Sequence, residues 1–347
     1  MPKFKAILKG LNTVKNDNSR KSFRIILVEF FNLWVTQKSF PMHYFSRFLY
    51  RKDYVNYKDY LTTKEILGLN YSLKIQNKFF IDLLENKLNF ANFCDKYNIP
   101  APKLLGFSTN GHFYYEGNTY AINSNKELEE TFIRLLELND LEKLFIKGVN
   151  NKGGVNIFLI RKSTLEDQIE ELCKTLLTND FIYQECISQH NGINKIYDKS
   201  INTIRFDFCS HKGELFFLGS GMRFGVNGNE IDNRSKGGFF VPINDKKKVL
   251  SKHGVKQMSF GGALLTEHPD TGFIFEDYSI PLYEEGRKLA MHLSTLIPIE
   301  LVGWDIAITP SGPYVIEGNH NSMLGMTEIG YGGYRKHPVI RELLQLI

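Results

Sequence analysis

Three oxygen-bearing side chains near the C-terminal end of the chain have the types and the spacing to bind a metal ion. Asp305, Glu317 and Asn319 lie in the stretch GWDIAITPSGPYVIEGN, residues 303–319. Two apolar runs flank a Ser-Gly-Pro turn at residues 311–313, a pattern typical of an antiparallel hairpin. Because side chains alternate along a strand, Glu317 and Asn319 share one face, and the hairpin brings Asp305 opposite them.

Hard oxygen ligands of this kind favour magnesium. Nucleotide sites commonly hold Mg²⁺ with one or two carboxylates while substrate phosphates complete the octahedron. The hairpin therefore indicates a site for Mg²⁺ and ATP. The alternative is a surface hairpin with polar ends, because short acidic patterns also recur by chance.

A glycine-rich loop upstream has the composition of a phosphate-binding flap. The loop GVNNKGG, residues 148–154, lies between two β-rich runs and follows Lys147. Its backbone N–H groups, including those of Gly153 and Gly154, could close over phosphate oxygens, with Lys147 supplying positive charge. The chain has no G-K-[ST] string, so the loop is not a Walker A motif. Taken by itself, it is also typical of a flexible hairpin turn.

The strand that follows ends in a switch from polar to apolar residues. At Glu185, Cys186 and Ile187 the backbone could pair with the edge of an adenine, and the last two side chains could sandwich its faces. An ordinary strand end would show the same pattern.

Two arginines on later strands point to an anion. An unpaired guanidinium is costly to bury, so Arg205 in INTIRFDF and Arg223 in GSGMRFG are either exposed or committed to an anion. The polar loop DNRSKGG, residues 232–238, follows them. Its Asn233, Gly237 and Gly238 are candidates for contacting a second substrate.

The order of these parts resembles the ATP-grasp superfamily over roughly residues 85–335, and it is most similar to the sugar-transfer-associated branch. The order of these motifs is also similar, more loosely, to that in the ribosomal-protein glutamate ligases and the D-alanine–D-alanine ligases. The segment NKLNFANFCDKYNIPAPKLLG extends the resemblance upstream and adds Lys87 as a second candidate contact for phosphate or nucleotide.

The resemblance implies an α+β fold in which two subdomains enclose a nucleotide cleft. It also implies that Asp305, Glu317 and Asn319 hold one or two Mg²⁺ ions, with Mn²⁺ as a substitute. Arg205 and Arg223 would stabilise charge on the transferred phosphoryl group. The implied reaction is carboxylate–amine ligation through an acyl phosphate, in surface polysaccharide biosynthesis. The alternatives are a phosphotransferase acting on a hydroxyl and a non-catalytic ATP-binding module of a glycan-assembly complex.

Two features depart from the family pattern. Many ligases continue with Pro-Gly after the E-x-N motif, whereas here the chain reads HNSMLG, residues 320–325. The N-terminal part, expected over residues 1–85, has a helical and basic character where the ligases carry an α/β unit. We expect the two ATP-grasp subdomains at residues 86–180 and 181–347.

Composition is that of a globular protein. The 347 residues are 42% hydrophobic and 23% charged, and the four cysteines lack the spacing of a zinc site or a disulfide framework. We find no signal-peptide pattern, and the longest apolar run, residues 23–35, is too short and too interrupted to span a membrane. The sequence therefore predicts a soluble, cytoplasmic protein.

Charge is concentrated at the N-terminus. Residues 1–60 carry 12 Lys and Arg against 4 Asp and Glu, whereas the remaining residues carry 31 against 34. This aromatic-rich segment either packs as a helical cap on the main body, with its lysines in water, or lies on an anionic membrane or a matching protein surface. A slightly acidic body argues against nucleic acid as a partner.

The coarse pattern of elements predicts an α+β fold with mixed sheets. It includes one helix over residues 72–97, ended by the two prolines of NIPAP. A second helix is predicted to start at a capping box formed by Ser163 and Glu166.

Overall fold

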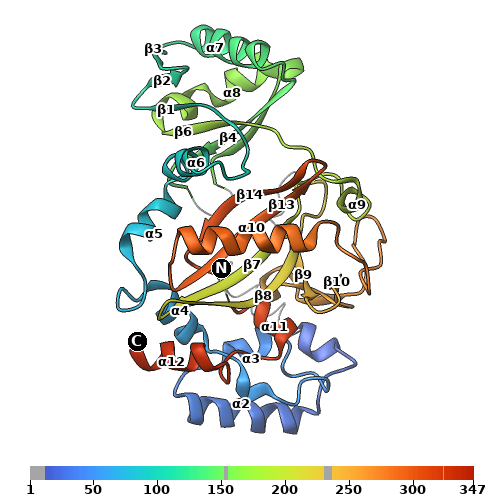
Figure 1. The fold of residues 1–347 in the computed structure, drawn as a ribbon. Helices are drawn as coiled ribbons and strands as arrows, with labels where there is room; N and C mark the ends of the chain where they lie inside the picture. The colour runs from blue at the N-terminus through green and yellow to red at the C-terminus, as the bar shows by residue number, and fades with distance from the viewer. Residues whose placement is uncertain (1–11, 152–154, 230–236, 323) are drawn as a thin grey trace. The chain divides into compact units, whose positions relative to one another are not determined.

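The computed structural model describes residues 12–151, 155–229, 237–322 and 324–347. The chain forms two compact units (Figure 1). The first unit comprises Met1–Ile81, Gln189–Pro313 and Gly318–Ile347, and the second comprises Asp82–Ser188 and Tyr314–Glu317. Both contain helices and sheets, which confirms the predicted α+β class.

The second unit is built on a six-stranded sheet with strand order β3-β2-β1-β6-β4-β5. Apolar side chains of α7 and α8 join those of the strands in one buried core that includes Phe132, Ile169 and Phe181. Helix α6 precedes the first strand. The elements are α6 (Lys87–Lys96), β1 (Leu104–Thr109), β2 (His112–Tyr115), β3 (Asn118–Ala121), α7 (Asn125–Leu138), β4 (Lys143–Gly148), β5 (Ile157–Arg161), α8 (Leu165–Thr178) and β6 (Phe181–Glu185).

The first unit is built on an eight-stranded sheet with order β12-β11-β9-β8-β7-β13-β14, in which β10 also pairs with β9. Helix α10 lies across β7 and β13 (Figure 1). Its elements after the N-terminal helices are α9 (Asn191–Asn194), β7 (Thr203–His211), β8 (Glu214–Phe224), β9 (Phe239–Asn244), β10 (Val249–Leu250), β11 (Gly254–Lys256), β12 (Ala263–Leu265), α10 (Tyr283–Leu296), β13 (Leu301–Thr309), β14 (Gly312–Asn319), α11 (Thr327–Tyr331) and α12 (Pro338–Leu346).

The N-terminal part of the chain is helical, as predicted. Its helices are α2 (Phe23–Gln37), α3 (Met42–Ser46), α4 (Thr63–Tyr71) and α5 (Lys78–Glu85), after a short helix over residues 12–16. Tyr44, Phe48 and Tyr50 are buried in a cluster with Phe240 and Val255 of the large sheet. These aromatics therefore attach the N-terminal helices to the body of the first unit.

Three predictions about elements are wrong. The single helix expected over residues 72–97 is two helices, because the side chain of Asn86 accepts from the N–H of Asn89 and caps the start of α6. Helix α8 starts at Leu165 after Thr164, so Ser163 and Glu166 form no capping box. The expected mixed sheets are antiparallel in every strand pair whose register the described residues define.

Within the described part of the chain, no helix is both long enough and apolar enough to cross a membrane. All four cysteines are free, and Cys186 alone of the four is not buried.

Candidate ATP-binding site

The predicted hairpin is formed by β13 and β14, which are neighbours at one edge of the large sheet. Its turn lies at residues 310–311, slightly before the predicted one, because β14 already begins at Gly312. The Nδ2 of Asn319 donates to Oδ2 of Asp305 at 3.2 Å. These two candidate metal ligands therefore lie together, as the alternation of side chains predicted.

Asp305 is the centre of an ion-pair cluster in the first unit. It lies directly opposite Arg205 in the pairing of β13 with β7. Arg205 donates to it with two N–H groups, Nε to Oδ1 at 2.6 Å and Nη2 to Oδ2 at 3.0 Å. Nη1 of Arg223 donates to the same Oδ2 at 2.6 Å. The two arginines are thus brought together, and the anion that both contact is Asp305.

This cluster carries net positive charge and is largely shielded from solvent. Arg205 is 5% exposed and Asp305 is 1% exposed. Burial alone would lower the pKa of Arg205, but the Asp305 carboxylate more than offsets it and the pKa is raised. Burial raises the pKa of the neighbouring Asp207 to about 7, so this carboxyl group is only partly ionised at neutral pH. Such a site is suited to attracting a further anion, for example a phosphate.

Gly303 makes room for Arg205, a role that the sequence reasoning missed. A Cβ atom at residue 303 would lie 2.7 Å from Cδ of Arg205 and 2.7 Å from Oδ1 of Asp207. The signal was present, because a glycine inside an otherwise apolar strand often marks a close approach by another group. Nη1 of Arg205 also donates to the carbonyl of Ser322 at 3.2 Å, which holds the guanidinium from the far side.

A second cluster, in the second unit, contains two lysines. Lys147 is the fifth residue of β4 and is 8% exposed. Burial lowers its pKa to about 8; Glu317 counteracts this shift, Lys87 adds to it and Cys186 weakly opposes it. Three other predicted site residues, Glu317, Lys87 and Cys186, thus act electrostatically on the buried amine of Lys147. We refer to Lys87, Lys147, Cys186 and Glu317 as the lysine cluster.

Lys87 is the first residue of α6 and is tied to the loop after β4. Its backbone N–H donates to the carbonyl of Val149 at 3.0 Å, and its Nζ donates to the carbonyl of Asn151. Lys87 therefore lies at the base of the glycine-rich loop. Gly153 and Gly154 of that loop lie outside the described residues.

Strand β14 contributes to both clusters. Residues 314–317 belong to the second unit, where the N–H of Val315 donates to the carbonyl of Pro100 at 2.9 Å. Glu317 acts there on Lys147. Two residues further, Asn319 belongs to the first unit and bonds Asp305.

The predicted adenine contact begins at the last residue of β6. The N–H of Glu185 donates to the carbonyl of Lys103 at 3.1 Å, and its Oε1 accepts from the N–H of Lys103 at 2.9 Å. These bonds fix the strand end against the segment before β1. Cys186 and Ile187 follow in an irregular, half-buried segment.

The predicted second-substrate loop is described only at its end. Asn233 lies outside the described residues. Gly237 has a φ of +93°, a conformation that favours glycine, and both Gly237 and Gly238 are buried. They lead into β9, whose Phe240 lies opposite Arg223 on β8.

The segment after the E-x-N motif is held by a helix from the N-terminal part of the chain. Nδ2 of Asn70 donates to Oδ1 of Asn321 at 2.5 Å, and Nδ2 of Asn321 donates to the hydroxyl of Tyr71 at 2.8 Å. The rings of Tyr71 and His320 meet edge to face at 5.7 Å between centroids. Helix α4 thus supports the segment that replaces the Pro-Gly of the ligases.

The residues present fit Mg²⁺ by donor type. Glu317 and Asp305 offer carboxylate oxygens and Asn319 offers an amide oxygen, all hard ligands. The described residues contain no group of three or more His, Cys, Asp or Glu able to hold a metal ion by themselves. Among these donors, Oδ2 of Asp305 already accepts from Arg223 and Asn319.

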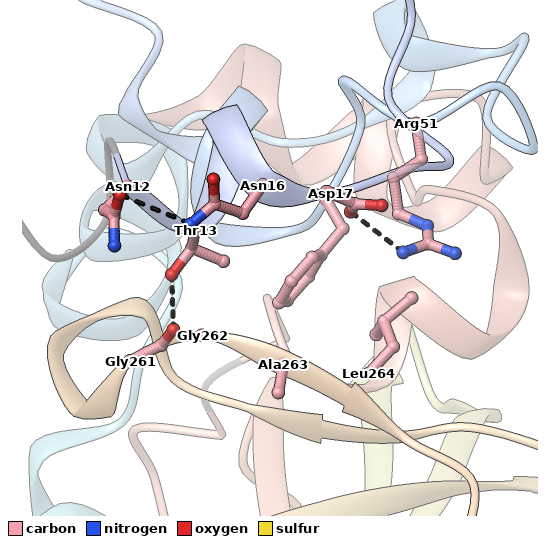
Figure 2. A pocket seen from close by; sticks show the side chains of 10 residues that line it. Asn12, Thr13, Asn16, Asp17, Arg51, Gly261, Gly262, Ala263 and Leu264 are labelled. Atoms are coloured by element: carbon pink, nitrogen blue, oxygen red, sulfur yellow. Dashed lines mark hydrogen bonds and ion pairs between the residues drawn. The ribbon is translucent and has the colours of Figure 1, made fainter.

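One pocket of the first unit is lined by none of the predicted site residues. It encloses about 430 Å³ between the N-terminal helical residues and the β11–β12 region (Figure 2). Oγ1 of Thr13 donates to the carbonyl of Gly261 at 2.5 Å, and Arg51 pairs with Asp17 at 2.8 Å. Each of these interactions joins two residues of the pocket's own lining.

The pKa of Lys147 gives a testable pH dependence. Only the protonated amine attracts phosphate, so we expect ATP affinity to fall roughly tenfold as the pH rises through about 8. Calorimetric titration with ATP at pH 7 and pH 9 measures this. In Lys147→Met the affinity should be low at both pH values; a variant that keeps the full pH dependence would contradict the assignment.

Solved structures resemble the chain at low identity. D-alanyl-alanine synthetase A from Vibrio cholerae is 14% identical with a TM-score of 0.44, over 76% of this chain and 65% of its own. An ATP-grasp RimK domain protein from Sphaerobacter thermophilus is 10% identical with a TM-score of 0.44, over 79% and 71%. The N5-carboxyaminoimidazole synthase from Aspergillus clavatus, solved with ADP, is 10% identical with a TM-score of 0.41, over 71% and 47%. The chain thus spans less than two thirds of the first and third of these proteins.

Sequence comparison is more decisive. No curated protein matches the chain. The profile of the family described as sugar-transfer associated ATP-grasp matches residues 67–339, which is most of the chain and contains every predicted site residue. The chain therefore belongs to the sugar-transfer associated ATP-grasp family.

Proposed function

We propose that this protein is an ATP- and Mg²⁺-dependent carboxylate–amine ligase of the cytoplasm that acts in surface polysaccharide biosynthesis. The proposal rests mainly on the two charged clusters to which β14 contributes a residue each. Glu317 acts on the buried Lys147, and Asn319 bonds Asp305 beside two arginines. Cations and oxygen ligands of this kind are what a triphosphate with its metal ion needs.

Each cluster has its own part in the proposed reaction. Lys147 and Lys87 bind phosphate oxygens, while Glu317, Asn319 and Asp305 hold the metal, which when bound neutralises charge on the phosphates. The substrate carboxylate attacks the γ-phosphorus and ADP leaves, giving an acyl phosphate. An amine then attacks the acyl carbon, and phosphate leaves as the amine loses a proton. Arg205 and Arg223 stabilise the negative charge in both steps.

The family description supports the proposed substrate class. That description connects the family to sugar transfer, which supports a sugar-linked or lipid-linked carboxylate as the acceptor. Residues 320–325, which Asn70 and Tyr71 of α4 support, stand where many ligases carry the Pro-Gly of the acceptor pocket, so we expect this segment to help select the substrate.

The reaction itself tests the proposal. The purified full chain is incubated with ATP, Mg²⁺ and pools of amino acids and uronic-acid sugars, while ADP, free phosphate and new masses are followed. A ligase releases ADP and phosphate in equal amounts together with an amide product. ADP with a stable phosphorylated compound would instead identify a phosphotransferase, and ATP binding without turnover for any pool would identify a non-catalytic module.

A further inference from the structure

Helix α2 exposes a face that is apolar apart from Arg24 near its N-terminal end. Its residues between 48% and 68% exposed include Phe23, Leu27, Val28, Phe31, Trp34 and Val35. At 100° per residue these six side chains fall within an arc of roughly 140°. Isolated exposed apolar residues are ordinary on protein surfaces, but a contiguous set of this size marks an interaction surface.

The opposite side of α2 packs against the body of the first unit. Ile26 and Leu33 are 5% and 0% exposed and belong to the cluster that contains Tyr44 and Phe48. Glu29 accepts from Nζ of Lys21 at 2.7 Å and from the hydroxyl of Tyr44 at 2.6 Å. These contacts fix the rotation of the helix, so the exposed face is not a core face turned outward.

The surroundings of this face are basic. Arg24 lies within the arc and Lys38 directly follows the helix; both are exposed, and no ion pair among the described residues engages either. The guanidinium of Arg20 stacks on the ring of Phe23 at 4.1 Å. The acidic residues of 12–60 are paired to cations, Asp17 and Asp53 to Arg51, Glu29 to Lys21 and Asp59 to Lys336. The uncompensated charge around α2 is therefore positive.

We propose that α2 lies flat on an anionic lipid surface, with its apolar face among the acyl chains and its cations against the headgroups. Fifteen residues make a helix of about 22 Å, which is too short to span a bilayer but suits binding in the interface plane. Phenylalanine and tryptophan favour that interface. A second copy of the chain fits less well, because a contact between two such faces would bring the cations Arg24 and Lys38 of one copy into the same interface as those of the other.

Trp34 provides a direct reporter. The chain has two tryptophans, and Trp304 is fully buried, so vesicle-induced changes in emission arise from Trp34. The full-length protein is mixed with vesicles of phosphatidylcholine containing 30% phosphatidylglycerol, or of phosphatidylcholine alone, and binding is measured by co-sedimentation and fluorescence. We expect a blue shift and sedimentation with the anionic vesicles, weakened by high salt.

Matched variants separate the two contributions. Leu27→Glu/Phe31→Glu and Arg24→Gln/Lys38→Gln should each reduce binding to anionic vesicles at least about tenfold. Leu73→Glu/Phe79→Glu changes residues that are 68% and 71% exposed elsewhere and should bind like the wild type.

Three results would overturn the proposal. One is no binding to either vesicle. A second is equal binding to neutral and anionic vesicles. The third is a dimer in light scattering that Leu27→Glu/Phe31→Glu dissociates while vesicles have no effect, since that would assign the face to a second copy of the chain.

Discussion

Glu317→Gln is expected to reduce ATP turnover at least about a hundredfold while leaving the fold intact. The substitution replaces a carboxylate oxygen with an amide nitrogen, which cannot bind Mg²⁺. It also removes the negative charge that raises the pKa of Lys147 against the effect of burial. A smaller fraction of Lys147 is therefore protonated at neutral pH. The variant thus loses both a metal ligand and part of the positive charge that binds phosphate. ADP release at saturating ATP and Mg²⁺ measures the result.

The control for this variant is Glu171→Gln, the same chemical change at an exposed position of α8 in the same unit. It should retain wild-type turnover, and thermal unfolding should show both variants folded. Because Glu317 and Lys147 interact, the double variant Glu317→Gln/Lys147→Met should lose less activity than the product of the single losses. Turnover of Glu317→Gln close to that of Glu171→Gln would remove Glu317 from the site.

Alternation of side chains was enough to predict part of the site. Asp305 and Asn319 lie on two strands joined by a short turn, so the period of two placed them together without knowledge of the rest of the fold. The same local reasoning predicted that the N-terminal part of the chain is helical. It failed at Asn86, where one capping side chain divides a helix that apolar spacing alone reads as continuous.

Contacts between distant segments could not be predicted in this way. Arg205 and Asp305 are 100 residues apart, and their direct opposition depends on the pairing of β7 with β13. The sequence predicted that each arginine is either exposed or committed to an anion, and pairing in the sheet places Asp305 against both. Similarly, the charge of the N-terminal part allowed either a packed cap or a binding surface. In the structure Tyr44 and Phe48 pack inward, while Phe31 and Trp34 are exposed.

Asp305→Asn is expected to cost about 3–5 kcal/mol in the free energy of unfolding. The substitution keeps the shape of the side chain but removes the carboxylate charge that pairs with both Arg205 and Arg223. The buried guanidinium of Arg205 then loses its bidentate carboxylate partner, which is the costly way to break a buried ion pair. Urea unfolding followed by fluorescence of the buried Trp304, in the same strand, measures the change.

Glu276→Gln is the matched control, because Glu276 pairs with Lys252 at 3.6 Å in the same unit and both side chains are more than half exposed. An exposed pair contributes little, so this variant should lie within about 0.5 kcal/mol of the wild type. The pH dependence adds a second check. The pKa of Asp207 is raised to about 7 by burial, and the charge of Asp305 adds to that rise. In Asp305→Asn that contribution is absent and the pKa of Asp207 is lower, so Asp207 ionises beside Arg205 and supplies part of the missing negative charge as the pH rises towards 7; the deficit of Asp305→Asn should therefore shrink over that range. A deficit that stays constant with pH, or one no larger than that of Glu276→Gln, would show that Asp305 does not stabilise the two arginines.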